Sequence, residues 1–233
     1  MDGASLPQPP MRTVRSFVRR QGRITLGQRR ALQQYGEQFL LGFTPGPLDL
    51  DRLFGRRAPR VIEIGFGMGD ALFDMACRHP EQDFIGIEVF LPGVGALLRR
   101  VGEQGLTNVR VISADAVQVL EQMIPDDTLS AVWLLFPDPW HKNKHHKRRL
   151  VQPDFAKLVR NKLQLQGCFH LATDWENYAQ QMMKVLSAAP GFANQCGAGQ
   201  FAPRPESRPL TKFERRGQRL GHGVRDLIFE RQA

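Results

Sequence analysis

The strongest constraint on the fold is a regular alternation of short apolar segments with segments of helical length and composition. The apolar segments are rich in β-branched and aromatic residues and end in Gly, Pro or an acid, which is typical of buried strands. They cover residues 60–65, 83–89, 109–115, 129–137 and 168–174, and the helical segments cover residues 70–79, 92–105, 116–124, 153–163 and 176–189. This alternation predicts an α/β fold with a doubly wound, mostly parallel sheet.

The ends of the chain add three expectations. A strand is predicted over residues 222–231, after a Gly/Pro-rich connection, and should pair antiparallel at or near the sheet edge. The N-terminus lacks the apolar core of a signal peptide and no stretch approaches the roughly 18 apolar residues of a membrane span, so we expect a cytoplasmic protein. The three scattered cysteines, Cys77, Cys168 and Cys196, are expected to be buried reduced thiols rather than metal ligands.

Charge is segregated along the chain. The net charge is +7 over residues 1–60, −8 over 61–140, +6 over 141–160, zero over 161–203 and +4 over 204–233. Basic blocks of this kind favour a phosphate-backbone partner over a merely solvated surface, because each neutralised phosphate releases condensed counterions. Charge therefore favours nucleic acid as the partner.

A glycine-rich turn follows the first predicted strand of the alternation. Residues 62–70, IEIGFGMGD, place Gly65, Gly67 and Gly69 at alternate positions before a helix. Ligands of parallel sheets bind beyond the carboxyl ends of the strands, so this turn predicts a ligand lying against bare backbone. At the next two strand ends, Glu88 is expected to accept hydrogen bonds from ribose hydroxyls and Asp115 from an adenine amino group.

Two details separate a nucleoside ligand from a dinucleotide. The spacing G-x-G-x-G differs from the G-x-G-x-x-G of pyrophosphate-binding turns, and Glu63 within the strand would repel phosphate. A cationic nucleoside without phosphates fits better, and S-adenosylmethionine, with its sulfonium and amino groups, is the predicted cofactor. Alternatively, Glu63 is a buried acid that backbone donors satisfy.

The most specific stretch covers residues 134–150, LLFPDPWHKNKHHKRRL. Two prolines restrict where Asp138 points, and the turn is similar to the Asp/Asn-Pro-Pro-aromatic loop of enzymes that methylate nitrogen in nucleobases. Trp140 either stacks on a base or packs under the loop. The basic residues that follow are expected to hold phosphate. No zinc site is expected, because no cysteine or carboxylate at ordinary spacing completes the histidines.

Together these motifs identify the chain as similar to the bacterial tRNA (guanine-N7-)-methyltransferases, which have the class I S-adenosylmethionine-dependent, Rossmann-like fold. The resemblance runs from about Arg15 to the C-terminus and rests on EIGFGMGD, GIEV, SADA, FPDPWHKNKHHKRRLVQPDF, LATDWENYA, TKFERRG and HGVRDLIFER. It implies a disordered tail over residues 1–14, a basic N-terminal arm over 15–57 and a methyltransferase domain over 58–233. The arm is expected to contact the RNA backbone, unless it is only a solvated helix face.

The resemblance also implies roles for individual residues. The cofactor pocket would contain the glycine turn with Glu63, Glu88, Asp115 and Asp138, and Asp138 would also be the catalytic acid. Substrate contacts would be Lys142, Asp174, Thr211, Lys212, Phe213 and Glu214. The RNA-contacting loop would contain Lys144, His145, His146, Lys147, Arg148 and Arg149. Purely structural roles compete at four positions, since Asp115 and Asp174 could cap helices, and Thr211 and Glu214 could form a capping box.

The implied reaction is methyl transfer from S-adenosylmethionine to N7 of a guanine in the variable loop of tRNA. Guanine N7 has a lone pair and no proton, so positioning should dominate, with Asp138 stabilising the cationic product. tRNA is the expected partner, and no obligatory protein partner is expected. Two alternatives remain: a methyltransferase acting on an exocyclic amino group of another RNA base, and a non-catalytic RNA-binding module. The intact acids argue against the module.

Overall fold

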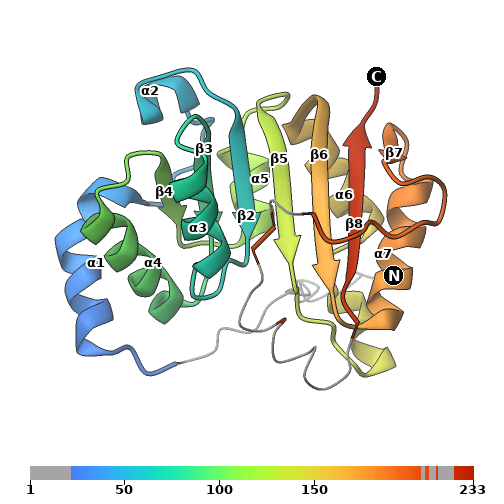
Figure 1. Ribbon diagram of the computed structural model, residues 1–233, viewed down its shortest axis with the longest axis horizontal. Coiled ribbons are helices and arrows are strands. Elements are labelled where there is room, and N and C mark those ends of the chain that lie inside the picture. Colours follow the sequence, from blue (N-terminus) through green and yellow to red (C-terminus); the bar gives the residue numbers. More distant parts are fainter. Residues whose placement is uncertain (1–21, 206–207, 210–213, 215–222) are drawn as a thin grey trace, which may run out of the picture.

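The structure is a computed structural model that describes residues 22–205, 208–209, 214 and 223–233 (Figure 1). The predicted tail over residues 1–14 lies outside the described residues, as does the start of the predicted arm. Thr211, Lys212 and Phe213 also lie outside them.

The described residues form one sheet of eight strands in the order β1-β4-β3-β2-β5-β6-β8-β7. The strands are β1 (Leu40–Leu41), β2 (Arg60–Ile64), β3 (Asp83–Ile87), β4 (Val109–Ile112), β5 (Leu129–Leu135), β6 (Leu163–Thr173), β7 (Phe192–Asn194) and β8 (Arg225–Arg231). Strands β1 to β6 pair in parallel, whereas β8 runs antiparallel to β6 and to β7. The predicted doubly wound, mostly parallel sheet is confirmed, and so is the antiparallel C-terminal strand next to the edge.

Helices cover both faces of this sheet (Figure 1). They are α1 (Leu26–Phe39), α2 (Leu50–Phe54), α3 (Asp70–Arg78), α4 (Leu91–Gln104), α5 (Ala116–Gln122), α6 (Pro153–Lys162) and α7 (Glu176–Ala188), with a 3₁₀ helix, η1 (Asn143–Arg148), after β5. The five predicted helices are α3 to α7. Strand β6 begins five residues earlier than predicted, because Leu163 pairs with Leu129 before the ladder resumes at Cys168.

Alternate residues of the strands face the two helical layers, which explains why these strands are apolar throughout. Val61 and Phe84 pack with α3, α4 and Phe39 of α1 in one cluster. Their neighbours Ile62 and Ile85 pack with α5, α6 and α7 in another. Burial on both faces is the arrangement that parallel sheets require.

The cysteine expectation is wrong in part. All three cysteines are free, but Cys77 and Cys196 are exposed and Cys168 is half-buried. Cys77 lies near the end of the amphipathic helix α3, whose buried positions are Ala71, Leu72, Met75 and Ala76, so position 77 faces outward.

Part of the predicted arm is ordered structure that packs on the sheet. Thr25 and Gln28 form a capping box at the start of α1, and β1 is the edge strand of the sheet, paired with β4. Helix α1 lies along α4 at positions where α4 has glycines. A β-carbon on Gly95 would lie 2.7 Å from the carbonyl oxygen of Gln28, so α1 approaches α4 only because that side chain is missing.

We therefore expect Gly95→Ala to lower the free energy of unfolding by about 1–3 kcal/mol, because α1 must shift away from the new methyl group. The matched control is Gly36→Ala in α1, where a β-carbon would meet nothing within 4 Å. That substitution should be neutral or should stabilise by about 0.5–1 kcal/mol through helix propensity. Urea unfolding of both variants measures the difference, and equal stability of the two would contradict the proposed packing.

Candidate functional site

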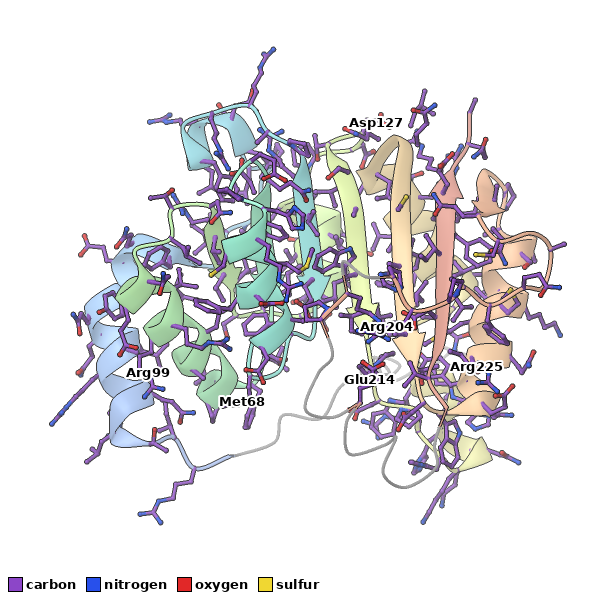
Figure 2. All side chains as sticks on the ribbon, in the orientation of Figure 1. Met68, Arg99, Asp127, Arg204, Glu214 and Arg225 are labelled. Carbon is purple, nitrogen blue, oxygen red and sulfur yellow. The ribbon has the colours of Figure 1, made fainter. Side chains whose placement is uncertain are left out.

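Most of the predicted site residues that the structure describes lie at or just beyond the carboxyl ends of the parallel strands. Figure 2 shows Met68, Arg99 and Glu214 at this end of the molecule, and Asp127 at the opposite end. Two adjoining cavities open here. The first, of about 350 Å³, is lined by Glu88, Phe90, Ala114 and Leu150 among others, and the second, of about 940 Å³, by Glu63, Arg99, Asp174 and Trp175 among others. Gly65, Gly67, Leu135, Phe136, Pro137 and Asp138 line both.

The glycine turn between β2 and α3 needs its glycines. Gly65, Gly67 and Gly69 have φ of 72°, 58° and 75°, a left-handed conformation that other residues rarely adopt. Helix α4 also approaches closely here, since a β-carbon on Gly93 would lie 1.9 Å from the carbonyl oxygen of Gly67. Gly65 and Gly67 thus present backbone without side chains to both cavities, whereas Gly69 lies outside both linings.

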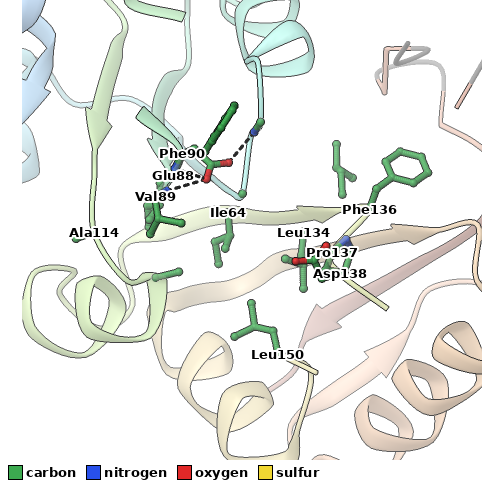
Figure 3. A pocket seen from close by; sticks show the side chains of 15 residues that line it. Ile64, Glu88, Val89, Phe90, Ala114, Leu134, Phe136, Pro137, Asp138 and Leu150 are labelled. Atoms are coloured by element: carbon green, nitrogen blue, oxygen red, sulfur yellow. Dashed lines mark hydrogen bonds between the residues drawn. The ribbon is translucent and has the colours of Figure 1, made fainter. Parts of the chain in front are cut away.

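Glu88 braces this turn from the end of β3 (Figure 3). Its Oε2 accepts a hydrogen bond from the backbone N–H of Gly67 at 2.8 Å, and its Oε1 accepts from the N–H groups of Val89 and Phe90 at 2.7 and 2.9 Å. Each carboxylate oxygen has two lone pairs. Oε2 therefore keeps capacity for a ribose hydroxyl while it fixes the turn.

Asp115 caps helix α5, which is the structural role that competed with a cofactor contact. Its Oδ1 accepts from the N–H of Val117 at 2.9 Å, at the start of α5. Its neighbours Ala114 and Ala116 line the first cavity, whereas Asp115 lies beside that lining. The structure thus gives Asp115 a capping role and leaves an adenine contact as a prediction.

Glu63 is a buried carboxyl group at the wall of the second cavity. It is 3% exposed, and its Oε2 has no hydrogen-bond partner among the described residues. Burial, and secondarily the charge of Glu88, raise the pKa of Glu63 to about 8. No backbone donor of the described chain satisfies this oxygen. A cationic ligand group nearby would stabilise the carboxylate form of Glu63.

Asp138 lies in a tightly bent turn at the end of β5, across the first cavity from Glu88 (Figure 3). Phe136 and Trp140 flank the Pro-Asp-Pro sequence with φ of 55° and 47°, which is unusual for residues with large side chains. The N–H of Phe136 donates to the carbonyl oxygen of Ala172 at 2.7 Å, so the turn is tied to the end of β6. Trp140 packs under the loop, with the Arg148 guanidinium 4.0 Å from its ring centroid.

The structure separates Arg149 from the rest of the predicted RNA-contacting loop. Lys142, Lys144 and Lys147 are exposed and His145, His146 and Arg148 are half-buried, but Arg149 is 2% exposed. Its Nε donates to the carbonyl oxygen of Pro139 at 2.8 Å, and its Nη1 donates to Gln181 Oε1 of α7 at 2.6 Å. As placed, Arg149 holds the Asp138 turn against α7 rather than facing solvent.

Asp174, predicted to contact substrate, lines the second cavity at the end of β6. Helix α7 begins after Trp175 without a side-chain cap in the described chain, so the carboxylate of Asp174 is not used for capping.

Glu214, also predicted to contact substrate, lies in a buried charge network. Arg208 donates to both carboxylate oxygens of Glu214 at 2.6 and 2.9 Å, and also to Asp226 Oδ2 of β8 at 3.0 Å.

The network continues into the sheet and back to the turn. His170 Nε2 of β6 lies 2.7 Å from Asp226 Oδ1, and the Arg208 guanidinium lies 5.7 Å from the ring centroid of Phe136. Burial lowers the pKa of Arg208, but the carboxylates outweigh burial and raise it above its ordinary value. Sequence reasoning missed Arg208 and His170, since no local motif marks them.

Two features are absent from the described part of the chain. No group of three or more His, Cys, Asp or Glu side chains suited to a metal ion occurs among the described residues. None of the helices in that part of the chain combines the length and apolar character needed to cross a membrane.

The fold is similar to that of solved class I methyltransferases. The chain aligns with the 16S rRNA methyltransferase KamB with a TM-score of 0.59 and 15% identity, over 79% of this chain and 93% of that one. It aligns with a 16S rRNA (adenine(1408)-N(1))-methyltransferase variant from Catenulisporales acidiphilia with a TM-score of 0.53 and 14% identity, over 80% and 92%. At this identity the likeness concerns the fold: a class I methyltransferase-like α/β sheet with antiparallel C-terminal strands.

Sequence relatives narrow the class to a family. A family model described as putative methyltransferase matches residues 57–227. The tRNA (guanine-N(7)-)-methyltransferase of Pseudomonas entomophila (strain L48) is 58% identical over 95% of this chain and 92% of its own length. That of Aeromonas hydrophila subsp. hydrophila is 59% identical over 95% and 93%. The chain belongs to the tRNA (guanine-N(7)-)-methyltransferase family.

The raised pKa of Glu63 gives a pH-dependent prediction. Because the folded protein holds this proton up to about pH 8 while the unfolded chain releases it near 4.5, stability contributed at Glu63 is lost as the pH rises between these values. Glu63→Gln should remove this loss. Relative to wild type without ligand, the variant should gain up to about 4 kcal/mol at pH 8 and less than about 1 kcal/mol at pH 5. Denaturant unfolding at both pH values measures this gain, and a pH-independent gain would contradict the burial of a titrating Glu63.

Proposed function

We propose that the protein transfers the methyl group of S-adenosylmethionine to N7 of a guanine in the variable loop of tRNA. The observation that carries this proposal is the 58% identity, over 95% of the chain, to proteins named tRNA (guanine-N(7)-)-methyltransferase. The arrangement of the site supports it, because Asp138 lies on the wall shared by the two cavities. Such a wall is where a cofactor in one cavity would meet a base in the other.

The first cavity suits the cofactor. Its walls combine apolar side chains with the backbone of the glycine turn and the carboxylate of Glu88, which together match a nucleoside. Glu63 supplies an acidic group at the adjoining wall, suited to the positive charges of the amino acid end. When bound, S-adenosylmethionine supplies an electrophilic methyl group on a sulfonium. The residues proposed to hold it are Glu63, Glu88, Asp115, Asp138 and the turn of Gly65, Gly67 and Gly69.

The chain's part in the reaction is to position the base and to stabilise charge. Guanine N7 needs no deprotonation, so alignment of the lone pair with the methyl group should supply most of the acceleration, an effect worth up to roughly 7–11 kcal/mol in well-oriented systems. The base becomes cationic as the bond forms. A carboxylate at Asp138, fixed by the prolines and by the Arg149 contact to Pro139, would stabilise the charge that grows in the transition state.

The second cavity and the basic loop are proposed to receive the RNA. Asp174 lines this cavity, and Lys142 is exposed in the segment beside it. Glu214 is connected to the cavity wall at Phe136 through Arg208. Lys144, His145, His146, Lys147 and Arg148 form the loop proposed to meet phosphate, together with the basic N-terminal segment. tRNA is the proposed partner, and no obligatory protein partner is expected.

Asp138 gives the sharpest test of the chemistry. We expect Asp138→Asn to retain tRNA binding but to lose roughly 100-fold or more in turnover, because the amide keeps the shape and removes the charge. The matched control is Asp127→Asn at the opposite end of the molecule (Figure 2), which should leave turnover unchanged. Labelled methyl transfer to tRNA that lacks the modification measures both, and near-wild-type turnover of Asp138→Asn would reject the electrostatic role.

The same assay distinguishes the alternative reactions. A tRNA carrying 7-deazaguanosine at the target position has carbon in place of N7, so wild-type protein should bind it and transfer no methyl group. An amino-group methyltransferase would still modify its adenine or cytosine, and a non-catalytic module would modify neither tRNA. Nucleoside analysis of the products identifies the methylated atom.

For the basic loop, we expect Lys144→Ala combined with Lys147→Ala to weaken tRNA binding and to reduce the slope of log affinity against log salt by about 1–2, because up to two phosphate contacts are lost. Replacing the exposed Lys157 and Lys184 of α6 and α7 makes the same charge change away from the loop and is the control. Affinity for S-adenosylhomocysteine should be unchanged in both variants. An equal slope in the two double variants would mean that the loop does not contact phosphate.

A further inference from the structure

Trp175 is an exposed aromatic residue in the second cavity, beside Asp174. It is 37% exposed, whereas Phe66 on the same wall is 6% exposed and packs in the core. Trp140, the other aromatic candidate for contacting a base, lies outside this lining and is engaged with Arg148 and His145. Among these aromatic residues, Trp175 has the most surface available in the cavity that contains Asp138 and Asp174.

The backbone and ring of Trp175 are held from several sides. Its N–H donates to Oγ1 of the buried Thr173 at 3.2 Å, and its carbonyl oxygen accepts from the N–H groups of Tyr178 and Ala179 at 2.9 Å each. The ring of His141 packs edge-on, with ring centroids 4.2 Å apart and an interplanar angle of 83°. A ring held in this way loses little conformational freedom when a flat ligand stacks on it.

A guanine that is to be methylated at N7 must present that atom to the cofactor, and a base taken out of its stack needs a replacement for the lost stacking. Aromatic side chains provide this replacement. The product base is cationic, and an indole face attracts cations through its quadrupole. Both properties match a tryptophan next to the proposed reaction centre.

We infer that Trp175 is the stacking platform for the target guanine and a positioning residue for methyl transfer. This inference rests on the proposed function. The indole holds the purine in the second cavity while Asp138 and Asp174 approach it as carboxylates, and it favours the 7-methylated, cationic base over the neutral one. No bond to Trp175 forms or breaks, and no proton is moved.

The test compares Trp175→Leu and Trp175→Phe with Phe43→Leu, a matched control at an equally exposed aromatic residue outside both cavities. We expect Trp175→Leu to lower kcat/KM for tRNA about 10- to 100-fold, Trp175→Phe to retain most of it and Phe43→Leu to match wild type. The preference for 7-methylated over unmethylated tRNA should fall in Trp175→Leu and persist in Trp175→Phe. Calorimetry with S-adenosylhomocysteine should give the wild-type affinity in all three.

A second tRNA separates stacking from a general effect on the fold. In tRNA with an abasic target nucleotide, Trp175→Leu and wild type should bind equally, whereas in unmodified tRNA the variant should bind more weakly. Equal weakening on both tRNAs, or a Trp175→Leu variant as active as Phe43→Leu, would overturn the inference. Failure of wild type to methylate N7 in the same assay would instead reject the proposed function.

Discussion

The site depends on a backbone segment held in a conformation that its side chains do not favour. Phe136 and Trp140 have positive φ on either side of Asp138, at a cost of about 1–3 kcal/mol each. The surrounding contacts offset this cost: the N–H of Phe136 is bonded to Ala172, and the carbonyl oxygen of Pro139 to the buried Arg149. Because both ends of the turn are fixed, the backbone that carries Asp138 has few alternative conformations, which reduces the reorganisation needed when charge develops beside it.

The buried ion network links this turn to the C-terminal part of the chain. Taking Glu214, Arg208 and Asp226 out of water is expensive, and a cluster of this kind is weak evidence for stability as such. Its geometry suggests another use. Arg208 contacts Glu214, Asp226 of β8 and the ring of Phe136, so it connects Glu214 to the sheet and to the turn at once. The charges thus specify where the Glu214 carboxylate lies, which apolar packing would fix less narrowly.

The sequence was sufficient for the architecture and for the edge of the sheet where the site lies, because both follow from local patterns. Apolar strands alternating with helices imply a parallel sheet, and parallel strands bring their carboxyl ends together. It was not sufficient to distinguish Arg148 from Arg149, which are identical neighbours in a basic run. One contacts the ring of Trp140, while the other is buried against Gln181, 32 residues away in the chain. Likewise, Arg208 and His170 meet through Asp226 only after β8 has paired with β6.

Side chains from the acidic and basic segments of the sequence lie at different parts of the same end of the sheet. The acidic central segment supplies Glu63, Glu88 and Asp138 to the cavity walls, and at the buried Glu63 a low dielectric strengthens the attraction for a cation. The basic segment after it places Lys142, Lys144 and Lys147 on the exposed surface directly beyond the turn. This end of the sheet therefore presents carboxylates at the cavity walls, which suit a cation, and lysines on and just before η1, which suit phosphate.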